Sequence, residues 1–376
     1  MKSIIHNPFV EYGYKGAQYF CDREKETKEI ITDLQGESNV ALISPRRIGK
    51  SGLIMHVFDE IKKLEPETVC VYIDILNTRD INQFINLFAS RIIGSLDSLS
   101  QSLMRKVVKF FGSVSPVLSF DELSGTPQLS FTIQPNQQRQ TLENVFRYIA
   151  DSKRRCYIAI DEFQQICEYP DGGLEPMLRS FIQFVPNAVF IFSGSEQHLM
   201  EEMFLSAKRP FYLSSHITAL GVIDEDKYLA FANGFFAKQK RKMDPDVFHG
   251  LYQLVDGQTW YVQSVLHQLY EMDDQPLDGD LVRMAVDYII GRMDVAYSNY
   301  YASLTDNQAA LLRAIAKEKC VKAPLRQEFL LKYSLPAASS VRLSLKSLEK
   351  RQMVYSLPNR GYVVYDRFFA IWLCRL

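Results

Sequence analysis

The sequence has 376 residues, of which 47% are hydrophobic and 23% are charged, and its formal net charge is −1. This length and composition predict a folded chain of two or three domains and exclude a disordered one. The near-zero charge excludes a generally basic protein, so any nucleic-acid surface must be a local patch.

The six cysteines form no C-x-x-C pair, and several lie in apolar runs. This placement favours buried reduced thiols over disulfides or a zinc site. No apolar run in the sequence reaches membrane-spanning length. We therefore expect a soluble, cytoplasmic protein without a membrane partner.

The first expected helix follows an aromatic segment that ends at residue 21. Asp22 is a fair N-cap for this helix, whose apolar positions follow at Ile30, Ile31 and Leu34. Because the helix comes just before a phosphate-loop motif, Arg23 could line the pocket of a nucleotide base. A surface helix with a charged first turn explains Arg23 equally well.

The motif around which the chain is organised lies between an expected buried strand at 40–43 and helical spacing at 53–58. A strand, a loop carrying Gly-Lys-Ser and a helix are the context of a phosphate-binding loop. Loop amides and the helix N-terminus would hold phosphate oxygens. Lys50 would reach the β- and γ-phosphates, and Ser51 would take one Mg²⁺ position. The expected nucleotide-binding residues are Ser44, Pro45, Arg46, Arg47, Ile48, Gly49, Lys50, Ser51 and Gly52.

Ser44 departs from the motif, because it stands where the first glycine is usual. A serine fits if that position does not need a positive φ. The alternative is a basic turn without function, which a complete Gly-Lys-Ser after a buried strand disfavours.

The next segments predict a second buried strand and further α/β elements. Asp74, at the end of the strand at 68–75, is either a carboxylate behind a metal site or a strand-end cap. A helix is expected over 81–112. Two β-like runs at 116–120 and 128–133 predict a hairpin inserted in the α/β core, before a helix at 141–150.

Two adjacent carboxylates, Asp161 and Glu162, follow an apolar strand at 156–160. Asp161 would hold Mg²⁺ opposite Ser51, and Glu162 would act as general base toward the attacking water. The pair follows the phosphate loop in the sequence, and another strand separates the loop from the pair. This order indicates nucleotide hydrolysis.

The strand expected at 188–195 ends in hydroxyl groups beside the Asp-Glu strand. Ser195 is our candidate for contacting the γ-phosphate or the attacking water, with Ser193 in reserve. Ser195 could instead, or also, be the N-cap of a helix at 197–204. Arg209 is a possible γ-phosphate sensor, and a solvated basic side chain is its alternative. The final core strand is expected at 217–223.

Strands disappear after Asp224, and the sequence predicts a bundle of four helices that would form a lid. Asp224 opens the first helix, and Asp244 with Pro245 opens the second. The third spans 259–270 and the fourth 280–293.

The last segment has the helix and strand order of a winged helix. Thr305 begins a capping box, and Ser339 with Ser340 would cap the third helix. That helix places Arg342, Lys346 and Lys350 on one face, which could meet DNA phosphates. A solvated face on a domain that binds protein is the alternative. An aromatic run at 366–373 should pack back on the domain.

Several motifs together resemble one known family. They are the Phe-Cys-Asp-Arg-Glu run, the Arg-Arg-Ile-Gly-Lys-Ser loop, Asp-Glu-Phe-Gln, Ser-Gly-Ser, Gly-Gln-Thr-Trp-Tyr and the terminal Asp-Arg-Phe-Phe. The chain resembles the archaeal-type ATPases of the STAND branch of AAA+ proteins and, more distantly, Orc-type replication initiators. The resemblance implies ATP and Mg²⁺ binding, slow hydrolysis used as a switch, and a lid and winged helix that respond to nucleotide. Relatives tend to carry Gly-Arg where this chain has Leu213-Ser214-Ser215, which weakens an arginine sensor here.

The sequence thus predicts an α/β fold with a P-loop AAA+ type parallel sheet core, a helical lid and a winged-helix domain. The expected domains are residues 1–222, 223–298 and 299–376. The expected function is an ATP-hydrolysing molecular switch that binds ATP and ADP and has a protein partner or self-associates. An ATP-gated DNA-binding regulator, an Orc-like initiator or a nucleotide-binding scaffold with negligible turnover are the alternatives.

Overall fold

In the computed structural model, the described residues are 6–97, 110, 115–120, 127–170, 172–272, 275–357 and 361–376. The chain forms two compact units, one of residues Tyr12–Ile223 and one of Met1–Glu11 with Asp224–Leu376.

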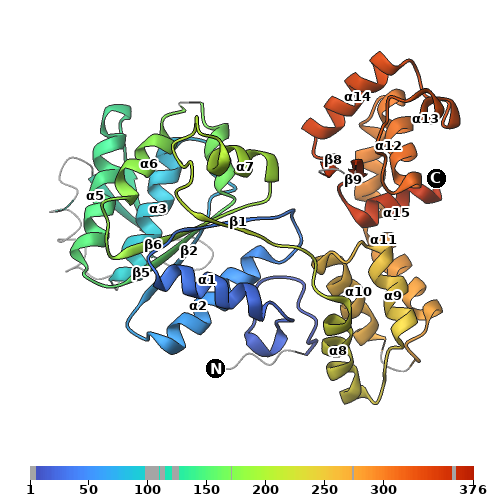
Figure 1. The fold of residues 1–376 in the computed structure, drawn as a ribbon, viewed down its shortest axis with the longest axis horizontal. Coiled ribbons are helices and arrows are strands. Elements are labelled where there is room, and N and C mark those ends of the chain that lie inside the picture. The colour runs from blue at the N-terminus through green and yellow to red at the C-terminus, as the bar shows by residue number, and fades with distance from the viewer. Residues whose placement is uncertain are drawn as a thin grey trace. The chain divides into compact units, whose positions relative to one another are not determined.

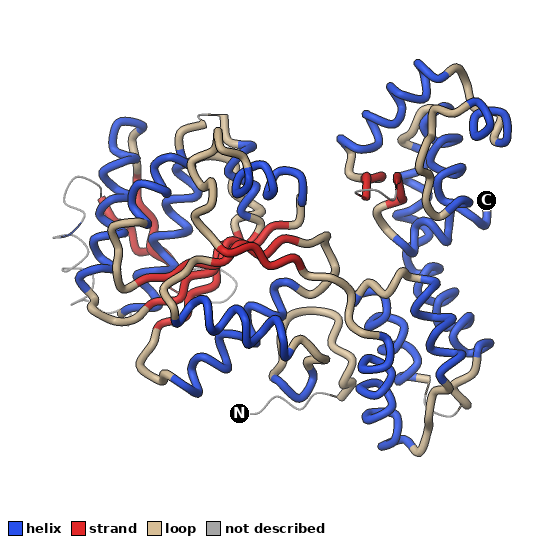
Figure 2. The backbone as a smooth tube through the Cα atoms, viewed as in Figure 1, coloured by secondary structure: helices blue, strands red, loops and turns tan. Residues whose placement is uncertain are grey.

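The first unit is built on a parallel sheet of five strands in the order β2-β5-β6-β1-β7 (Figure 2). The strands are β1 Val40–Ile43, β2 Val69–Asp74, β5 Cys156–Asp161, β6 Ala188–Gly194 and β7 His216–Ala219. The carboxyl ends of parallel strands share one edge of a sheet, so the polar residues that follow β1, β5 and β6 are brought together there.

Helices cover both faces of this sheet (Figure 1). One face packs on α1 Glu24–Gln35 and α2 Lys50–Leu64; the other packs on α3 Ile81–Leu96, α5 Gln138–Asp151, α6 Leu174–Ile182 and α7 Gln197–Leu205. Side chains alternate between the faces, with Val40 and Leu42 toward α1 and α2 and Ala41 and Ile43 on the opposite side. Burial on both faces explains why the central strands are continuous apolar runs, and the predicted parallel α/β core is confirmed.

The predicted hairpin is confirmed, because β3 Ser115–Phe120 and β4 Pro127–Thr132 pair as a separate antiparallel sheet. The helical structure predicted over 81–112 is confirmed for residues 81–96 and 110, but the helix is interrupted at Asp97. α3 ends at Leu96, and Asp97 has an extended backbone and accepts a hydrogen bond from the Tyr148 hydroxyl of α5. Residues 98–109 and 111–112 of that prediction lie outside the described residues.

The N-cap predicted at Asp22 is wrong. α1 begins at Glu24, and the residue before it, Arg23, has a φ of 77° and makes no side-chain cap bond. Both Asp22 and Arg23 have left-handed backbones, so the chain reaches the helix through a turn that no capping pattern encodes.

The second unit begins with the predicted helices after Asp224, which are α8 Glu225–Phe236, α9 Pro245–Leu254, α10 Thr259–Glu271 and α11 Gly279–Ala302. Asp224 and Asp244 cap α8 and α9 as predicted, with Pro245 at the first position of α9. α11 is longer than predicted and is continuous past residue 299, where the sequence places a domain boundary. Phe9 of the N-terminal segment is fully buried among aromatic side chains of α8 and α10.

The winged-helix order is confirmed in the rest of this unit. Its elements are α12 Asp306–Glu318, α13 Gln327–Lys332, α14 Ala338–Lys350, β8 Val354–Leu357, β9 Gly361–Val364 and α15 Arg367–Arg375. The capping box at Thr305 is present, but the caps predicted at Ser339 and Ser340 are wrong, because both lie inside the first turn of α14. The terminal aromatic run packs back as predicted, with Phe369 and Trp372 against Tyr297 of α11.

None of the described helices combines the length and the apolar composition that crossing a membrane requires.

Candidate functional site

The loop between β1 and α2 has the backbone of a phosphate-binding turn. Arg47 and Gly49 have positive φ values, 67° and 101°, whereas Ser44 does not. Ser44 therefore occupies the position of the usual first glycine without backbone strain. Gly49 is the N-cap of α2, so the loop delivers the chain into the helix end that favours anions.

Lys50, the first residue of α2, lies beneath this loop and is 5% exposed. Its Nζ donates to the carbonyl oxygens of Ser44 and Pro45, each at 3.0 Å. Burial lowers the pKa of Lys50, while the charges of Glu162 and Asp161 act in the opposite direction. A buried ammonium group favours an anionic ligand, which phosphate oxygens would provide.

Asp161, at the end of β5, joins the loop to the sheet. Its Oδ2 accepts hydrogen bonds from the hydroxyls of Ser51 at 2.6 Å and Tyr72 at 2.5 Å, and its Oδ1 accepts from the Glu162 amide. Burial and the charge of Asp161 raise the pKa of Tyr72, so its hydroxyl remains a donor. A hydroxyl and a carboxylate in contact are oxygen ligands of the kind that Mg²⁺ takes, so these residues fit the ion.

Glu162 follows Asp161 with a left-handed backbone, φ 56°. Its Oε2 accepts hydrogen bonds from Ser195 Oγ at 2.5 Å and from Gln164 Nε2 at 2.6 Å. Ser195 Oγ also accepts from Arg46 Nε of the loop at 3.3 Å. The loop after β1, the end of β5 and the end of β6 therefore form one polar network.

The two serines after β6 have different surroundings. Ser195 is not the N-cap of α7, because that position is Glu196 and makes no side-chain cap bond. Ser193 is fully buried, and its hydroxyl has no hydrogen-bond partner among the described residues. Gly194 between them has no room for a side chain, since a Cβ there would lie 2.5 Å from Gln164 Oε1 and 2.4 Å from Met200.

The structure does not bring the two candidate arginines into this network. Arg23 is 4% exposed and donates to Glu26 and to the carbonyl of Gly221, so it is not a solvated residue of a surface helix. Arg209 is not merely solvated either, because it pairs with Glu175 at 2.9 Å and lies near Glu202 at 3.7 Å. A nucleotide contact by either arginine stays a prediction.

Asp74 is an exposed strand-end cap, because its Oδ1 accepts from the Leu76 amide at 2.9 Å. Gly52 is on the first turn of α2, where an added Cβ would lie in van der Waals contact with Phe20, 3.5 Å from its Cε2. Sequence reasoning missed Tyr72 and Gln164. The available signal for Tyr72 was a hydroxyl-bearing side chain inside the apolar run of β2, whereas Gln164 lies among other polar residues after Asp161 and gave no distinct signal.

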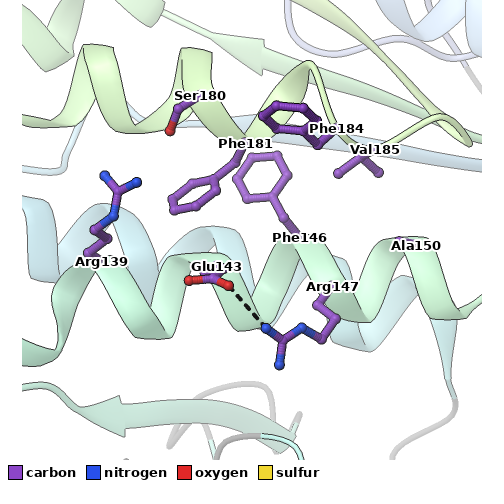
Figure 3. Close-up of a pocket in the computed structure, with 9 residues that line it drawn as sticks. All are labelled: Arg139, Glu143, Phe146, Arg147, Ala150, Ser180, Phe181, Phe184 and Val185. Atoms are coloured by element: carbon purple, nitrogen blue, oxygen red, sulfur yellow. Dashed lines mark hydrogen bonds and ion pairs between the residues drawn. The ribbon is translucent and has the colours of Figure 1, made fainter.

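A hollow of about 420 Å³ lies between α5 and α6, and Figure 3 shows Phe146 and Phe181 side by side in it. Arg139 lies over the Phe181 ring, and Glu143 pairs with Arg147 at the edge. This hollow shares no residue with the loop or the strand ends, so it is not the nucleotide site.

The face predicted on the third winged-helix helix is present. Arg342, Lys346 and Lys350 are exposed on α14. Leu343 beside them is 71% exposed, so this helix offers cations and an apolar side chain together.

A parallel sheet whose strand β1 leads through Gly-Lys-Ser into a helix, with Asp-Glu at a neighbouring strand end, defines a P-loop nucleotide-binding protein. A family model described as "ATPase domain predominantly from Archaea" matches residues 20–265, and one described as "Probable winged helix domain" matches 295–375. The chain belongs to this archaeal-type ATPase domain family and carries a C-terminal winged helix domain.

Individual relatives are distant. An uncharacterized ATP-binding protein of Methanocaldococcus jannaschii is 25% identical over 272 residues, covering 66% of this chain and 70% of that protein. The Walker-type ATPase of Pyrococcus abyssi is 18% identical with a TM-score of 0.65, covering 98% of this chain and 100% of that one. The Aeropyrum pernix ORC1 protein, solved in complex with DNA, is 13% identical with a TM-score of 0.56, covering 98% and 96%. These solved structures share the fold.

Proposed function

We propose that this protein is an ATP-binding and slowly ATP-hydrolysing molecular switch. The observation that carries the proposal is the contact of Ser51 Oγ with Asp161 Oδ2 at 2.6 Å, which joins the phosphate loop to the strand end that carries Glu162. Lys50 and the loop amides from Ser44 to Gly52 would bind the phosphates. Ser51 and Asp161 would hold Mg²⁺, which neutralises charge on the phosphate oxygens when it is bound.

Hydrolysis requires a base near the γ-phosphate, and Glu162 is our candidate. The oxygen of a water molecule bonds to the γ-phosphorus, the bond from that phosphorus to the bridging oxygen breaks, and ADP leaves. Glu162 accepts the proton that the water loses. Ser195, which already contacts Glu162, would donate its hydroxyl hydrogen to a γ-phosphate oxygen and so sense ATP.

A Glu162→Gln variant tests this assignment. We expect it to bind ATP like the wild type but to hydrolyse it about 10²- to 10⁴-fold more slowly, the usual contribution of a general base. Glu168→Gln is the matched control, because Glu168 is an exposed carboxylate at the end of the 3₁₀ helix that follows Glu162. Lys50→Ala should lose ATP binding instead. Unchanged turnover in Glu162→Gln would remove Glu162 from its role.

Two observations support slow turnover and a switch. The Ser195 hydroxyl donates to Glu162 in this structure, so it must turn away from Glu162 before it can donate to a γ-phosphate oxygen. The family match includes the helices α8 and α9 and is followed by a winged helix, and we propose that these parts respond to the nucleotide state and engage a protein partner or a second copy. On the motif resemblance, we also propose that the protein belongs to the STAND branch of AAA+ ATPases. Arg23 near the base and Arg209 as a sensor are secondary proposals, and Arg209 would have to leave Glu175.

A second candidate function is an ATP-gated DNA-binding regulator. The exposed cations of α14 favour it, together with the fold shared with an ORC1 protein solved in complex with DNA. The exposed Leu343 on the same helix favours a protein partner. A measurement of salt-dependent DNA binding distinguishes a DNA-binding α14 from one that binds a protein partner.

A further inference from the structure

Gln164 is a buried side chain that the proposed mechanism leaves without a role. It lies in the 3₁₀ helix Phe163–Glu168 and is 3% exposed. Its Nε2 donates to Glu162 Oε2 at 2.6 Å and lies 3.5 Å from Ser195 Oγ. Its Oε1 is buried and has no hydrogen-bond partner among the described residues. A buried amide oxygen without a partner lowers stability, so stability alone does not account for a glutamine here.

The hydroxyl of Ser195 explains why a second donor is needed at Glu162. A serine hydroxyl has one hydrogen, and that of Ser195 is given to Glu162 Oε2. If Ser195 donates to a γ-phosphate oxygen, it releases Glu162 at the moment when Glu162 must face the attacking water. Of the side-chain donors that the described residues bring to Glu162, Gln164 then remains.

The surroundings of Gln164 fix its position. The space beside Gly194 is filled by Gln164 Oε1 and the Met200 side chain, so closely that a Cβ on Gly194 would overlap both. Because the Gln164 amide is close-packed, it stays in place when the Ser195 hydroxyl rotates toward the phosphate. We propose that Gln164 is a positioning residue that holds the Glu162 carboxylate in place for proton transfer while Ser195 contacts phosphate. The proposal rests on the proposed function, because it takes Glu162 as the base.

Gln164→Met tests the proposal with a side chain of similar length that lacks the donor. We expect kcat to fall roughly 10- to 100-fold, as misplacement of a catalytic group does. The KM and dissociation constant for ATP should stay within about twofold, because Gln164 takes no part in the proposed phosphate contacts. The melting temperature should not fall, because the variant also removes an unpartnered oxygen.

Gln165→Met is the matched control. Gln165 lies in the same 3₁₀ helix, but its Nε2 donates to the carbonyl oxygen of Thr78 at 3.2 Å. Its kcat should equal that of the wild type. Wild-type kcat in Gln164→Met would overturn the proposal.

Gln164→Glu provides a readout that a structural role would not change. It places a second carboxyl group against Glu162, and two carboxyl groups in contact retain a shared proton to higher pH. We expect the acidic limb of the kcat pH profile to move to higher pH, while Gln165→Glu leaves it in place. An unmoved limb in Gln164→Glu would also overturn the proposal.

The Glu162→Gln variant separates this proposal from the proposed function. If Glu162→Gln hydrolyses ATP like the wild type, the proposed function and the role of Gln164 both fail. If Glu162→Gln is inactive while the Gln164 variants keep the wild-type kcat and pH profile, only the role of Gln164 is refuted.

Discussion

The carboxylate of Asp161 collects hydrogen bonds from three segments that are far apart in the sequence. Ser51 comes from the phosphate loop, Tyr72 from β2, and the amide of Glu162 from the chain directly after it. Asp161 is 3% exposed, and a buried carboxylate needs hydrogen-bond donors to offset the loss of its contacts with water. Tyr72 therefore helps to hold the Asp161 carboxylate in place beside the phosphate loop.

Tyr72→Phe should destabilise the protein by about 1.5 kcal/mol or more, because the variant removes a hydrogen bond to a charged group. Tyr169→Phe is the control: its hydroxyl bonds the neutral Thr78 hydroxyl, which keeps a bond to the Ile75 carbonyl. Tyr169→Phe should lower the free energy of unfolding by about 0.5–1 kcal/mol. Urea denaturation in EDTA, with hydrogen exchange of the β5 peptide, reports the unit that contains both tyrosines. Equal losses would contradict a special role for Tyr72.

The residues that the sequence predicted and those that it missed differ in one physical respect. Lys50, Ser51 and Asp161 belong to short local patterns, a loop before a helix and a strand before carboxylates. Tyr72 reaches Asp161 only through the register of β2 on β5, which pairs Asp74 with Asp161. The register between these two strands could not be predicted from the sequence. The partners of Ser195 and Gln164 likewise depend on how β6 lies beside β5.

Elements were predicted well where burial alone determines them and poorly where single backbone angles do. The central strands are apolar on both faces, so their positions could be predicted. Helix starts failed at Asp22 and Ser339, because a cap requires specific φ and ψ values as well as a suitable side chain. α3 ends where Asp97 accepts a hydrogen bond from Tyr148 of α5, and the local spacing of apolar residues does not predict that contact.

Helix α2, which begins at the phosphate loop, carries a histidine that contacts the segment before α1. The His56 ring stacks on Phe20 with 4.5 Å between centroids, and its Nδ1 lies 2.9 Å from the Tyr14 hydroxyl. Burial lowers the pKa of His56, and Lys63 lowers it further, against the opposing effects of Glu60, Asp59 and Glu24. The neutral ring is therefore the form that the fold favours.

Protonation of His56 should weaken the fold as the pH falls below about 6.5, its usual pKa. In that range the unfolded chain binds more protons than the folded one, so the free energy of unfolding decreases with decreasing pH. Each unit by which folding lowers the pKa corresponds to about 1.4 kcal/mol. His56→Phe keeps a ring against Phe20 and cannot titrate, so it should lose less stability than the wild type between pH 7.5 and 5.5. Hydrogen exchange of the α2 peptide measures this, and identical losses would refute it.

At the scale of the whole molecule, the chain adds a winged helix to an ATPase domain, and the surface of α14 determines what that addition can bind. Three exposed cations lie at a spacing of four residues, and Leu343 is exposed among them. Cations in a row match phosphates, whereas an exposed leucine matches an apolar protein surface. The net charge of −1 means that no general attraction to DNA would hide the contribution of this face.

Duplex DNA binding tests the second function directly. If α14 contacts phosphates, the affinity for DNA should fall as the salt concentration rises. The double substitution Arg342→Ala with Lys346→Ala should weaken binding. It should also reduce the slope of log K against log salt by about 2, because each phosphate that the protein no longer neutralises accounts for roughly 0.9. Lys317→Ala with Lys322→Ala is the matched control, because it removes the same charge from exposed positions of the winged helix outside α14. ATP-bound Glu162→Gln protein should bind more tightly than the ADP form if the nucleotide gates this face. Failure to bind DNA at low salt, or equal weakening by both pairs of substitutions, would exclude DNA recognition by α14 and leave a protein as its partner.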